Sequence, residues 1–284
     1  MSFTYHEPGT VDEAAALLAS HGPDTVVLAG GTAFAILYRG GLIRPAHVVG
    51  LRRCTELRGI RTDASGLWIG ALATHREIER SAIVRAHHAA ITDTFARIAT
   101  VRIRHQATVG GNLAHADPAQ DPPPTLIAFN ATVTVAGRGG ARRDIAIEEL
   151  FVDHLTTSLV EGEIIVGVRI PPVAAGTRAT YLKFLPRSQD DYATVSVAAA
   201  LRIDGDGRIA SPRVALGAVG PTPVRAQAVE DAIAGQRPSA GLFANAAALV
   251  RDAIAPLDDV RGSAAYKRDM AVVWTRRALE QVAA

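Results

Sequence analysis

Two glycine pairs constrain the fold of this chain more than any other feature. The first stands in "LAGGTA", Leu28–Ala33, between the apolar run "TVVL" and a helix-like segment, and the second stands in "TVGGN", Thr108–Asn112. Glycine reaches backbone angles that other residues avoid, and without a Cβ its amide can approach a ligand closely. A strand that ends in such a turn and opens a helix offers an anion both amide groups and the positive end of the helix dipole.

The two pairs carry more information together than either does alone. For a single Gly-Gly the simpler interpretation is a tight strand-to-helix turn, and the spacing is not that of the G-x-G-x-x-G dinucleotide fingerprint. The second pair adds the Thr108 hydroxyl and the Asn112 amide, which can bond to phosphate or ribitol oxygens. Two such turns predict a clamp around a long, anionic cofactor. A side chain at Gly31 or Gly110 should then block this ligand and leave the chain folded.

Composition excludes several classes of protein. The 284 residues are 48% hydrophobic and 20% charged, which suits a globular chain, and the net charge of +2 is too small to indicate a nucleic-acid surface. Cys54 is the single cysteine, which excludes an internal disulfide, an iron–sulfur cluster or a cysteine-rich zinc site. No apolar run approaches the roughly 20 residues that span a bilayer, and "MSFTYHEPGTVDEAAALL" lacks the pattern of a secretion signal. We therefore expect a soluble, cytoplasmic protein.

The order of the expected elements divides the chain into three parts. Residues 1–55 predict strands over 25–28 and 47–51 and helices over 10–22 and 32–40, with Thr10 as the cap of the first helix. Residues 56–175 predict strands over 67–74, 131–137 and 161–172 around a helical stretch at 82–99, and Thr74 with Glu77 predicts a further helix cap. Asp117 is expected to cap a helix beginning at Pro118, with Pro122–Pro124 distorting its first turn. Residues 176–284 predict three strands, the last two joined by a turn at 204–207, and helices from Val224 onward.

Other candidate groups favour simpler roles. His105 and His115 lack the spacing of metal ligands, so we interpret them as hydrogen-bonding residues near a cofactor or a partner. His87 and His88 are expected to form a surface pair on a helix, and Cys54 to be a structural thiol. The sequence therefore predicts neither a metal site nor a catalytic residue.

Three motifs in this order make the interpretation specific. The segments "LAGGTA", "ATVGGNLAHADPAQD" and "KFLPRSQDDYATVSVAAAL" together resemble the flavin-binding medium subunit of the molybdenum hydroxylase family, and the ending "RGSAAYKRDMAVVWTRRAL" resembles that family's last helix. The resemblance implies an α+β fold of the p-cresol methylhydroxylase/vanillyl-alcohol oxidase type. Two FAD-binding subdomains, 1–55 and 56–175, would be followed by a domain at 176–284, with a three-stranded antiparallel sheet and helices, that covers the flavin.

The resemblance also implies which residues bind FAD. One phosphate loop would comprise Ala29, Gly30, Gly31, Thr32 and Ala33, and the other Thr108, Gly110, Gly111 and Asn112. Asp117 or Asp121 would bind the ribityl or adenosine hydroxyls, and Ile165 would contact the flavin. Tyr192 would lie near the ring face.

Lys183 has two competing interpretations. The family places a basic residue beside the flavin at this point, and Lys183 is one of only two lysines in the chain. A structural role would instead pair Lys183 with Asp190 or Asp191 at an exposed site, where its loss would cost at most about 1 kcal/mol.

The function implied by the resemblance is electron transfer. Electrons would pass from a molybdenum cofactor in a large partner subunit, through two [2Fe-2S] clusters in a small partner subunit, to FAD in this chain and on to an external acceptor, in a dimer of heterotrimers. A stand-alone FAD-dependent oxidoreductase and a scaffold without flavin are the alternatives. Carbon monoxide dehydrogenases typically carry histidine and serine where this chain has Thr32 and Ala33, which argues against carbon monoxide as the substrate.

Overall fold

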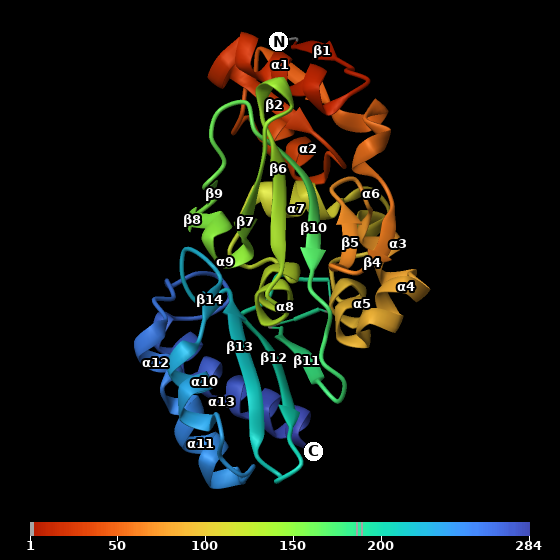
Figure 1. Ribbon diagram of the computed structural model, residues 1–284. Coiled ribbons are helices and arrows are strands. Elements are labelled where there is room, and N and C mark those ends of the chain that lie inside the picture. The colour runs from red at the N-terminus through yellow and green to blue at the C-terminus, as the bar shows by residue number, and fades with distance from the viewer. Residues whose placement is uncertain (1–2, 186, 189) are drawn as a thin grey trace.

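The computed structural model describes residues 3–185, 187–188 and 190–284. Figure 1 shows an elongated molecule in which the N-terminal layer, a central sheet with its helices and a C-terminal domain follow one another along the long axis. Each part has its own sheet, of three, five and four strands respectively, and a small two-stranded sheet completes the fold. The mixed α+β class predicted from the sequence is confirmed.

The N-terminal layer is a parallel sheet with helical connections. Its strands lie in the order β1 (Thr4–His6), β3 (His47–Gly50) and β2 (Thr25–Leu28), and the helices are α1 (Val11–His21) and α2 (Thr32–Arg39). Thr10 caps α1, as expected, by accepting the amide of Glu13 at 3.2 Å. Whereas α1 buries an apolar face, every residue of α2 remains at least partly exposed.

An antiparallel sheet with seven helices forms the centre. The strand order is β4 (Ile60–Asp63), β5 (Gly66–Gly70), β10 (Ile164–Ile170), β6 (Thr132–Ala136) and β7 (Arg142–Ala146), and β8 (Phe151–Asp153) pairs with β9 (Thr156–Thr157) beside it. The helices of this part are α3 (His75–Arg80), α4 (Ala82–His87), α5 (Ala89–Ala96), α6 (Val101–Gln106), α7 (Val109–His115), α8 (Pro122–Ala128) and α9 (Ile147–Leu150). Short 3-10 helices occupy Gly22–Asp24, Leu51–Arg53, Thr55–Leu57 and Arg138–Gly140.

The helical stretch expected at 82–99 is broken at His88. This residue adopts an extended conformation between α4 and α5, and its ring accepts the amide of Ala90 at the start of α5. The rings of His87 and His88 also lie 3.0 and 3.2 Å from the carbonyl oxygens of Pro171 and Thr177. The expectation of a surface pair was therefore wrong, because both half-buried rings bond to the segment that joins the centre to the C-terminal domain.

The helix expected at Pro118 begins four residues later. Asp117 accepts the amide of Ala119 at 2.9 Å and holds a turn, while α8 begins at Pro122. Pro122–Pro124 occupy the first positions of α8, where a missing amide costs nothing because first-turn amides have no partner inside a helix. The three prolines therefore start a helix rather than distort one.

The C-terminal domain packs helices on an antiparallel sheet. Its strands run β11 (Arg178–Phe184), β12 (Val195–Ile203), β13 (Ile209–Gly217) and β14 (Val224–Arg225) in that order, followed by α10 (Gln227–Ile233), α11 (Ala240–Ala248), α12 (Val250–Ala253) and α13 (Ala264–Ala283). The turn at 204–207 joins β12 and β13, with Asp204 bonded to Arg208 through the backbone. The two residues of β14 extend the expected three-stranded sheet to four strands.

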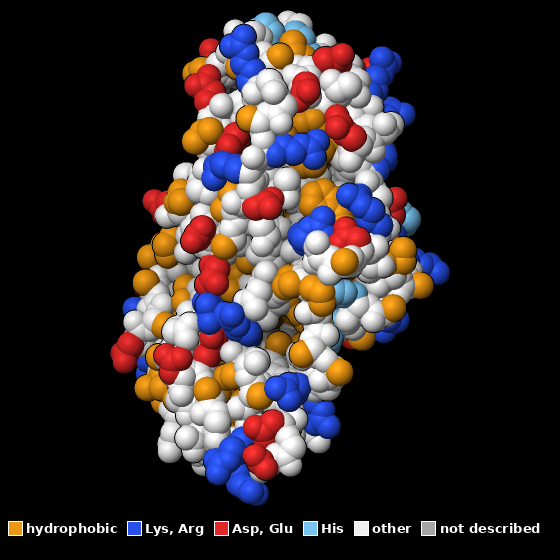
Figure 2. All heavy atoms as spheres, in the orientation of Figure 1, with side chains coloured by type: hydrophobic (Ala, Val, Ile, Leu, Met, Phe, Trp, Pro, Cys, Tyr) orange, Lys and Arg blue, Asp and Glu red, His pale blue; other side chains and the backbone are white. Residues whose placement is uncertain are grey.

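Burial and charge agree with a globular chain. The N-terminal layer and the centre share one apolar core, and the C-terminal domain has a second. On the face drawn in Figure 2, basic and acidic side chains are interspersed, without a continuous basic stripe. Of the helices in the described ranges, none combines the length and the apolar character that a membrane crossing requires.

Candidate cofactor site

The first glycine pair joins β2 to α2 in a sharp turn. Gly31 has φ +72° and ψ 4°, a left-handed conformation that strains any other residue. The first amide that donates inside α2 is that of Ala35, which bonds to Gly31 O at 2.9 Å, so the amides of Thr32, Ala33 and Phe34 have no acceptor within the helix. Among the described residues no side chain caps α2. This turn therefore presents amide groups and a positive helix end to a ligand.

The second glycine pair serves a different purpose. It follows no strand and instead forms the first turn of α7, which Thr108 caps by accepting the amide of Gly111 at 3.1 Å. The amide of Gly110 donates to Ala71 O at 2.9 Å, so both glycine amides already have partners. A Cβ on Gly110 would lie 2.6 Å from Ala71 Cβ and 2.9 Å from Ala71 O. The expectation that this pair exposes amides to a phosphate was wrong, because Gly110 is needed for packing against the strand end.

The two turns lie against each other although about eighty residues separate them. A Cβ on Gly30 would come within 2.0 Å of Gln106 O, and one on Gly111 would lie 3.5 Å from Ala29 Cβ. Backbone from the N-terminal layer thus contacts backbone from the centre directly. The two motifs are therefore adjacent in the fold, and a clamp around a cofactor stays a prediction.

A cavity of about 620 Å³ opens between the turns and reaches the C-terminal domain. It brings together thirteen of the fourteen residues singled out in the sequence: Ala29, Gly30, Gly31, Thr32, Ala33, Thr108, Gly110, Gly111, Asn112, Asp121, Ile165, Lys183 and Tyr192. Asp117, the fourteenth, does not line the cavity, because its carboxylate holds the turn before α8. Apolar side chains, among them Ile36, Ile43, Leu51 and Ile98, line much of the remaining wall. The cavity can therefore hold a large ligand with both polar and apolar parts.

Several polar groups in this cavity have no partner inside the described protein. Asn112 Oδ1, Gln120 Oε1 and both ring nitrogens of His75 are buried and form no hydrogen bond there. Buried polar groups are nearly always paired, so these atoms indicate a ligand that supplies the missing donors and acceptors. Together with the free amides of α2, this set fits a ligand with a pyrophosphate and hydroxyl groups.

His75 and Gln120 are functional candidates that sequence reasoning missed. His75 follows the Thr74 cap at the start of α3, so the sequence indicates a helix start there but not that the ring is fully buried. Burial, together with the positive charge of Arg104, lowers the pKa of His75 to about 3. Gln120 stands inside the second motif, where the two aspartates beside it drew the prediction instead. Both residues are identified by buried polar atoms that have no hydrogen-bond partner among the described residues, and only the folded structure reveals this.

Lys183 forms a buried ion pair in the wall of the cavity. Its Nζ donates to Asp121 Oδ2 at 3.0 Å and to Arg97 O at 3.1 Å, and the Tyr181 hydroxyl donates to Asp121 Oδ1. Burial raises the pKa of Asp121, and the charge of Lys183 opposes that shift. The expected pairing with Asp190 or Asp191 at an exposed site was wrong, because β11 directs Lys183 inward and Asp121 lies opposite it.

Tyr192 and Ile165 mark two other parts of the wall. Tyr192 is 44% exposed, and the Arg261 guanidinium lies 5.4 Å from the centre of its ring. Ile165 is 4% exposed and belongs to β10, where a bulge separates it from Gly167. Of the two histidines of the second motif region, His115 lines the cavity and His105 is exposed. The prediction for His105 as a residue near a cofactor is not supported by its position.

Comparison with known proteins agrees with this geometry. The family described as "FAD binding domain in molybdopterin dehydrogenase" matches residues 1–173, and "CO dehydrogenase flavoprotein C-terminal domain" matches residues 180–282. The carbon monoxide dehydrogenase medium chain of Hydrogenophaga pseudoflava is 34% identical over 277 residues, covering 98% of this chain and 96% of the relative. The glyceraldehyde dehydrogenase medium chain of Sulfolobus acidocaldarius is 32% identical over 286 residues, covering 99% and 98%.

A solved structure extends the likeness to three dimensions. Carbon monoxide dehydrogenase from Hydrogenophaga pseudoflava, in a form that lacks the Mo-pyranopterin moiety of its cofactor, matches with a TM-score of 0.96 and 35% identity, over 99% of this chain and 97% of that one. The fold and the site thus define a flavoprotein subunit of an oxidoreductase. The chain belongs to the FAD-binding medium subunits of the molybdenum hydroxylase family.

Proposed function

We propose that the cavity between the two glycine turns binds FAD and that this chain transfers electrons from iron–sulfur clusters of a partner subunit to an external acceptor. The observation that carries the proposal is the uncapped start of α2 at Gly31, which faces the unpaired Asn112 and Gln120 side chains around one cavity. When bound, FAD would supply a centre that accepts two electrons in single steps and delivers them to the external acceptor. The residues of this chain position that centre and set the charge around it.

Each wall of the cavity would bind a different part of the cofactor. The amides of Thr32, Ala33 and Phe34 suit the pyrophosphate, because they have no acceptor in the described ranges of the chain and lie at the positive end of a helix. Asn112 and Gln120 can bond to the polar chain between the phosphate and the ring system. Gly30 allows the two turns to meet, since a Cβ there would lie 2.0 Å from Gln106 O, whereas a Cβ on Gly111 would make only an ordinary contact with Ala29 at 3.5 Å.

The part of the cavity lined by Ile165, Lys183 and Tyr192 would surround the flavin ring. Ile165 is a buried apolar residue of β10, and Tyr192 is a partly exposed aromatic residue. Lys183 brings a positive charge, but Asp121 balances it at 3.0 Å. We therefore expect Lys183 to shift the reduction potential of a bound flavin less than an unpaired cation would.

The chain is proposed to act within a larger assembly. Its single cysteine is buried, so the clusters that would deliver electrons must belong to partners. The relatives are named as medium chains, which supports the presence of further subunits. We propose a small subunit with two [2Fe-2S] clusters and a large subunit with the molybdenum cofactor, assembled as a dimer of heterotrimers. A cytoplasmic location stays a prediction.

The substrate of that assembly is not assigned to this chain. The relatives are named after substrates as different as carbon monoxide and glyceraldehyde, although their medium chains are similar to this one over nearly their whole length. We therefore propose that a large partner subunit selects the substrate. The Thr32 and Ala33 positions, which differ from the residues typical of carbon monoxide dehydrogenases, give no support to carbon monoxide.

Flavin analysis tests the proposal directly. The purified chain should be yellow and should release FAD rather than FMN on denaturation, because the uncapped α2 turn is matched to a pyrophosphate that FMN lacks. Chromatography of the released flavin identifies it. A colourless chain that also fails to take up added FAD would contradict the proposal.

Co-purification separates the electron-transfer role from a stand-alone enzyme. The chain isolated from its native host should bring with it molybdenum, iron and two further polypeptides. Reduction of its flavin by substrate should then require those partners. A chain that purifies alone and is reduced directly by a small substrate would favour the stand-alone oxidoreductase.

A further inference from the structure

Three histidines meet at the outer end of the N-terminal layer. His6, His21 and His47 each offer a ring nitrogen, and these nitrogens all lie within 4.8 Å of one another. Within the described part of the chain this is the one cluster of three histidine, cysteine or acidic side chains with such spacing. None of the three lines the proposed FAD cavity.

The convergence follows from the strand register and from the end of α1. Thr4 pairs with His47 between parallel strands β1 and β3, and since side chains alternate along a strand, His6 lies on the same face as Thr4 and His47. Helix α1 packs against this sheet and ends at His21. The three histidines are 15 to 41 positions apart in sequence, and the strands β1 and β3 and the helix α1 hold them close together.

The rings already contact one another closely. His6 Nε2 lies 3.1 Å from His47 Nδ1 at hydrogen-bonding distance, and the rings of His21 and His47 stack with centroids 3.8 Å apart. A hydrogen bond between two imidazoles requires an unprotonated nitrogen in one of them, so the cluster holds at least one lone pair. All three rings are half-buried, which limits their alternative positions.

The nitrogen–nitrogen distances suit a tetrahedral ion, and the stacked His21 and His47 rings must turn so that each directs a ring nitrogen at it. With metal–nitrogen bonds of about 2.0–2.1 Å, ligand nitrogens of a tetrahedral zinc site lie roughly 3.4 Å apart. The His6–His47 pair is at 3.1 Å, and the most distant pair would approach by roughly 1.4 Å at most. A set of neutral imidazoles selects borderline divalent ions such as Zn²⁺, Ni²⁺ and Cu²⁺ over Mg²⁺ or Ca²⁺, which prefer oxygen ligands.

We propose that His6, His21 and His47 form a binding site for a divalent transition metal that ties β1 and β3 to the end of α1. A water molecule would complete the coordination, because three protein ligands leave one tetrahedral position open. The ion would take the place of the shared proton between His6 and His47. Because it binds only the folded layer, it would raise the stability of that layer.

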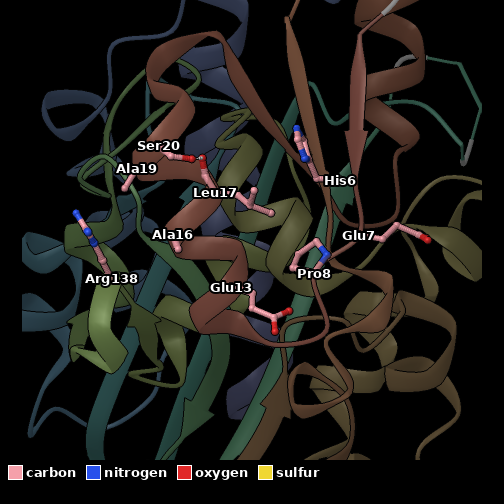
Figure 3. A pocket seen from close by; sticks show the side chains of 9 residues that line it. All are labelled: His6, Glu7, Pro8, Glu13, Ala16, Leu17, Ala19, Ser20 and Arg138. Carbon is pink, nitrogen blue, oxygen red and sulfur yellow. Dashed lines mark hydrogen bonds between the residues drawn. The ribbon is translucent and has the colours of Figure 1, made fainter.

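Solvent can reach the cluster. His6 lies at the edge of an open hollow beside α1, whose other lining residues include Glu7, Leu17 and Arg138. Figure 3 shows the His6 ring extending toward α1 near Leu17, with Glu7 directed away from it. Glu7 pairs with Arg53 at 3.2 Å, so its carboxylate is occupied outside the cluster. Figure 2 shows histidine atoms at the surface of this end of the molecule.

Metal titration tests the site without reference to FAD. The full-length chain, prepared without a polyhistidine tag and stripped with a chelator, should bind one Zn²⁺ per chain in calorimetry and melt at a higher temperature when loaded. His21→Gln should weaken Zn²⁺ binding at least tenfold and abolish the thermal shift. His154→Gln is the matched control, since His154 is exposed outside the cluster and its loss should change neither result.

A spectroscopic measurement on the unaltered chain keeps the test decisive if a variant folds poorly. Cu²⁺ bound at one equivalent should show electron paramagnetic resonance couplings to several imidazole nitrogens. The proposal is overturned if the unaltered chain binds no Zn²⁺ at micromolar concentration, if His21→Gln binds Zn²⁺ as tightly as the unaltered chain, or if bound Cu²⁺ lacks nitrogen couplings. Flavin content has no bearing on any of these results, so this proposal and the FAD proposal can fail separately.

Discussion

The two walls of the cavity are built in different ways. The wall from the N-terminal layer ends in the helix α2, whose residues are all at least partly exposed and whose first amides have neither a cap nor another partner among the described residues. The wall from the centre and the C-terminal domain is closed: Gly110 bonds to Ala71, and Lys183 pairs with Asp121. The first wall offers backbone amides to a ligand. The second wall uses Gly110, Lys183 and Asp121 to hold the fold and offers only side chains such as Asn112 and Gln120 to a ligand.

Because the two walls differ, substitutions of similar residues in them should have different effects. Both glycine pairs look alike in sequence, yet a Cβ on Gly110 meets the backbone oxygen of Ala71, while a Cβ on Gly31 meets only the flexible end of Leu28 at 3.2 Å. Changes in the closed wall should therefore reduce stability first. A small change at Gly31 in the open wall should reduce ligand binding first, whereas Gly30, whose Cβ would lie 2.0 Å from Gln106 O, is needed for packing.

The largest effect is expected from Lys183→Met. This change leaves the Asp121 carboxylate buried without its cation, and breaking a buried ion pair in this way costs about 3–5 kcal/mol. Urea unfolding followed by circular dichroism measures the loss. The double variant Lys183→Met/Asp121→Asn should recover part of it, because the buried charge is then removed. A loss below about 1 kcal/mol would instead indicate an exposed pair.

Gly110→Val should come next. The new Cβ would lie 2.6 Å from Ala71 Cβ, and because backbone cannot move aside easily, we expect a loss of about 1–3 kcal/mol or more in unfolding free energy. Gly111→Ala is the control, since its Cβ meets the Thr108 hydroxyl at a milder 3.0 Å. If Gly110→Val were as stable as the unaltered chain and merely lost flavin, the closed wall would be a binding wall after all.

His75 gives the closed wall a pH dependence. Folding lowers the pKa of His75 from 6.5 to about 3, so between these values the unfolded chain binds a proton that the folded chain does not. The contribution of neutral His75 to the free energy of unfolding is therefore complete above pH 6.5 and declines as the pH falls. At pH 5 the free energy of unfolding should be lower by about 2 kcal/mol. His75→Phe should remove this part of the acid sensitivity. Unfolding curves of both proteins at pH 7.5 and pH 5 measure it, and equal pH dependence would contradict the assignment.

The sequence predicted the parts of the molecule that depend on local rules. The Thr10 and Thr74 caps and the hairpin turn at 204–207 follow from a few neighbouring residues, and the structure confirms them. The resemblance through three motifs supplied the family. Three predictions were wrong because another group competed for the residue concerned. Lys183 pairs with the distant Asp121, and the amides of Gly110 and Gly111 bond to Ala71 and Thr108. At Pro118 a local turn held by Asp117 takes the place of the expected helix start.

Long-range partners explain what could not be predicted. Asp121 and Lys183 are 62 positions apart, and nothing in either motif indicates that β11 directs the lysine at that carboxylate. Residues 6, 21 and 47 are equally unremarkable in sequence, because no histidine spacing typical of a metal site connects them. Strand register and helix length bring such groups together, and neither can be read with single-residue accuracy from composition or periodicity.

The smallest change in stability is expected in the open wall, from Gly31→Ala. An alanine at φ +72° costs about 1 kcal/mol, and its Cβ meets only a side-chain carbon of Leu28, so the chain should remain folded. Relief of that strain would turn the first amides of α2 away from the cavity, and FAD affinity should fall at least tenfold. Fluorescence titration of the flavin-free chain measures this, with Gly111→Ala beside it as a variant of the closed wall. Unchanged FAD affinity in a folded Gly31→Ala chain would show that the α2 amides do not bind the cofactor.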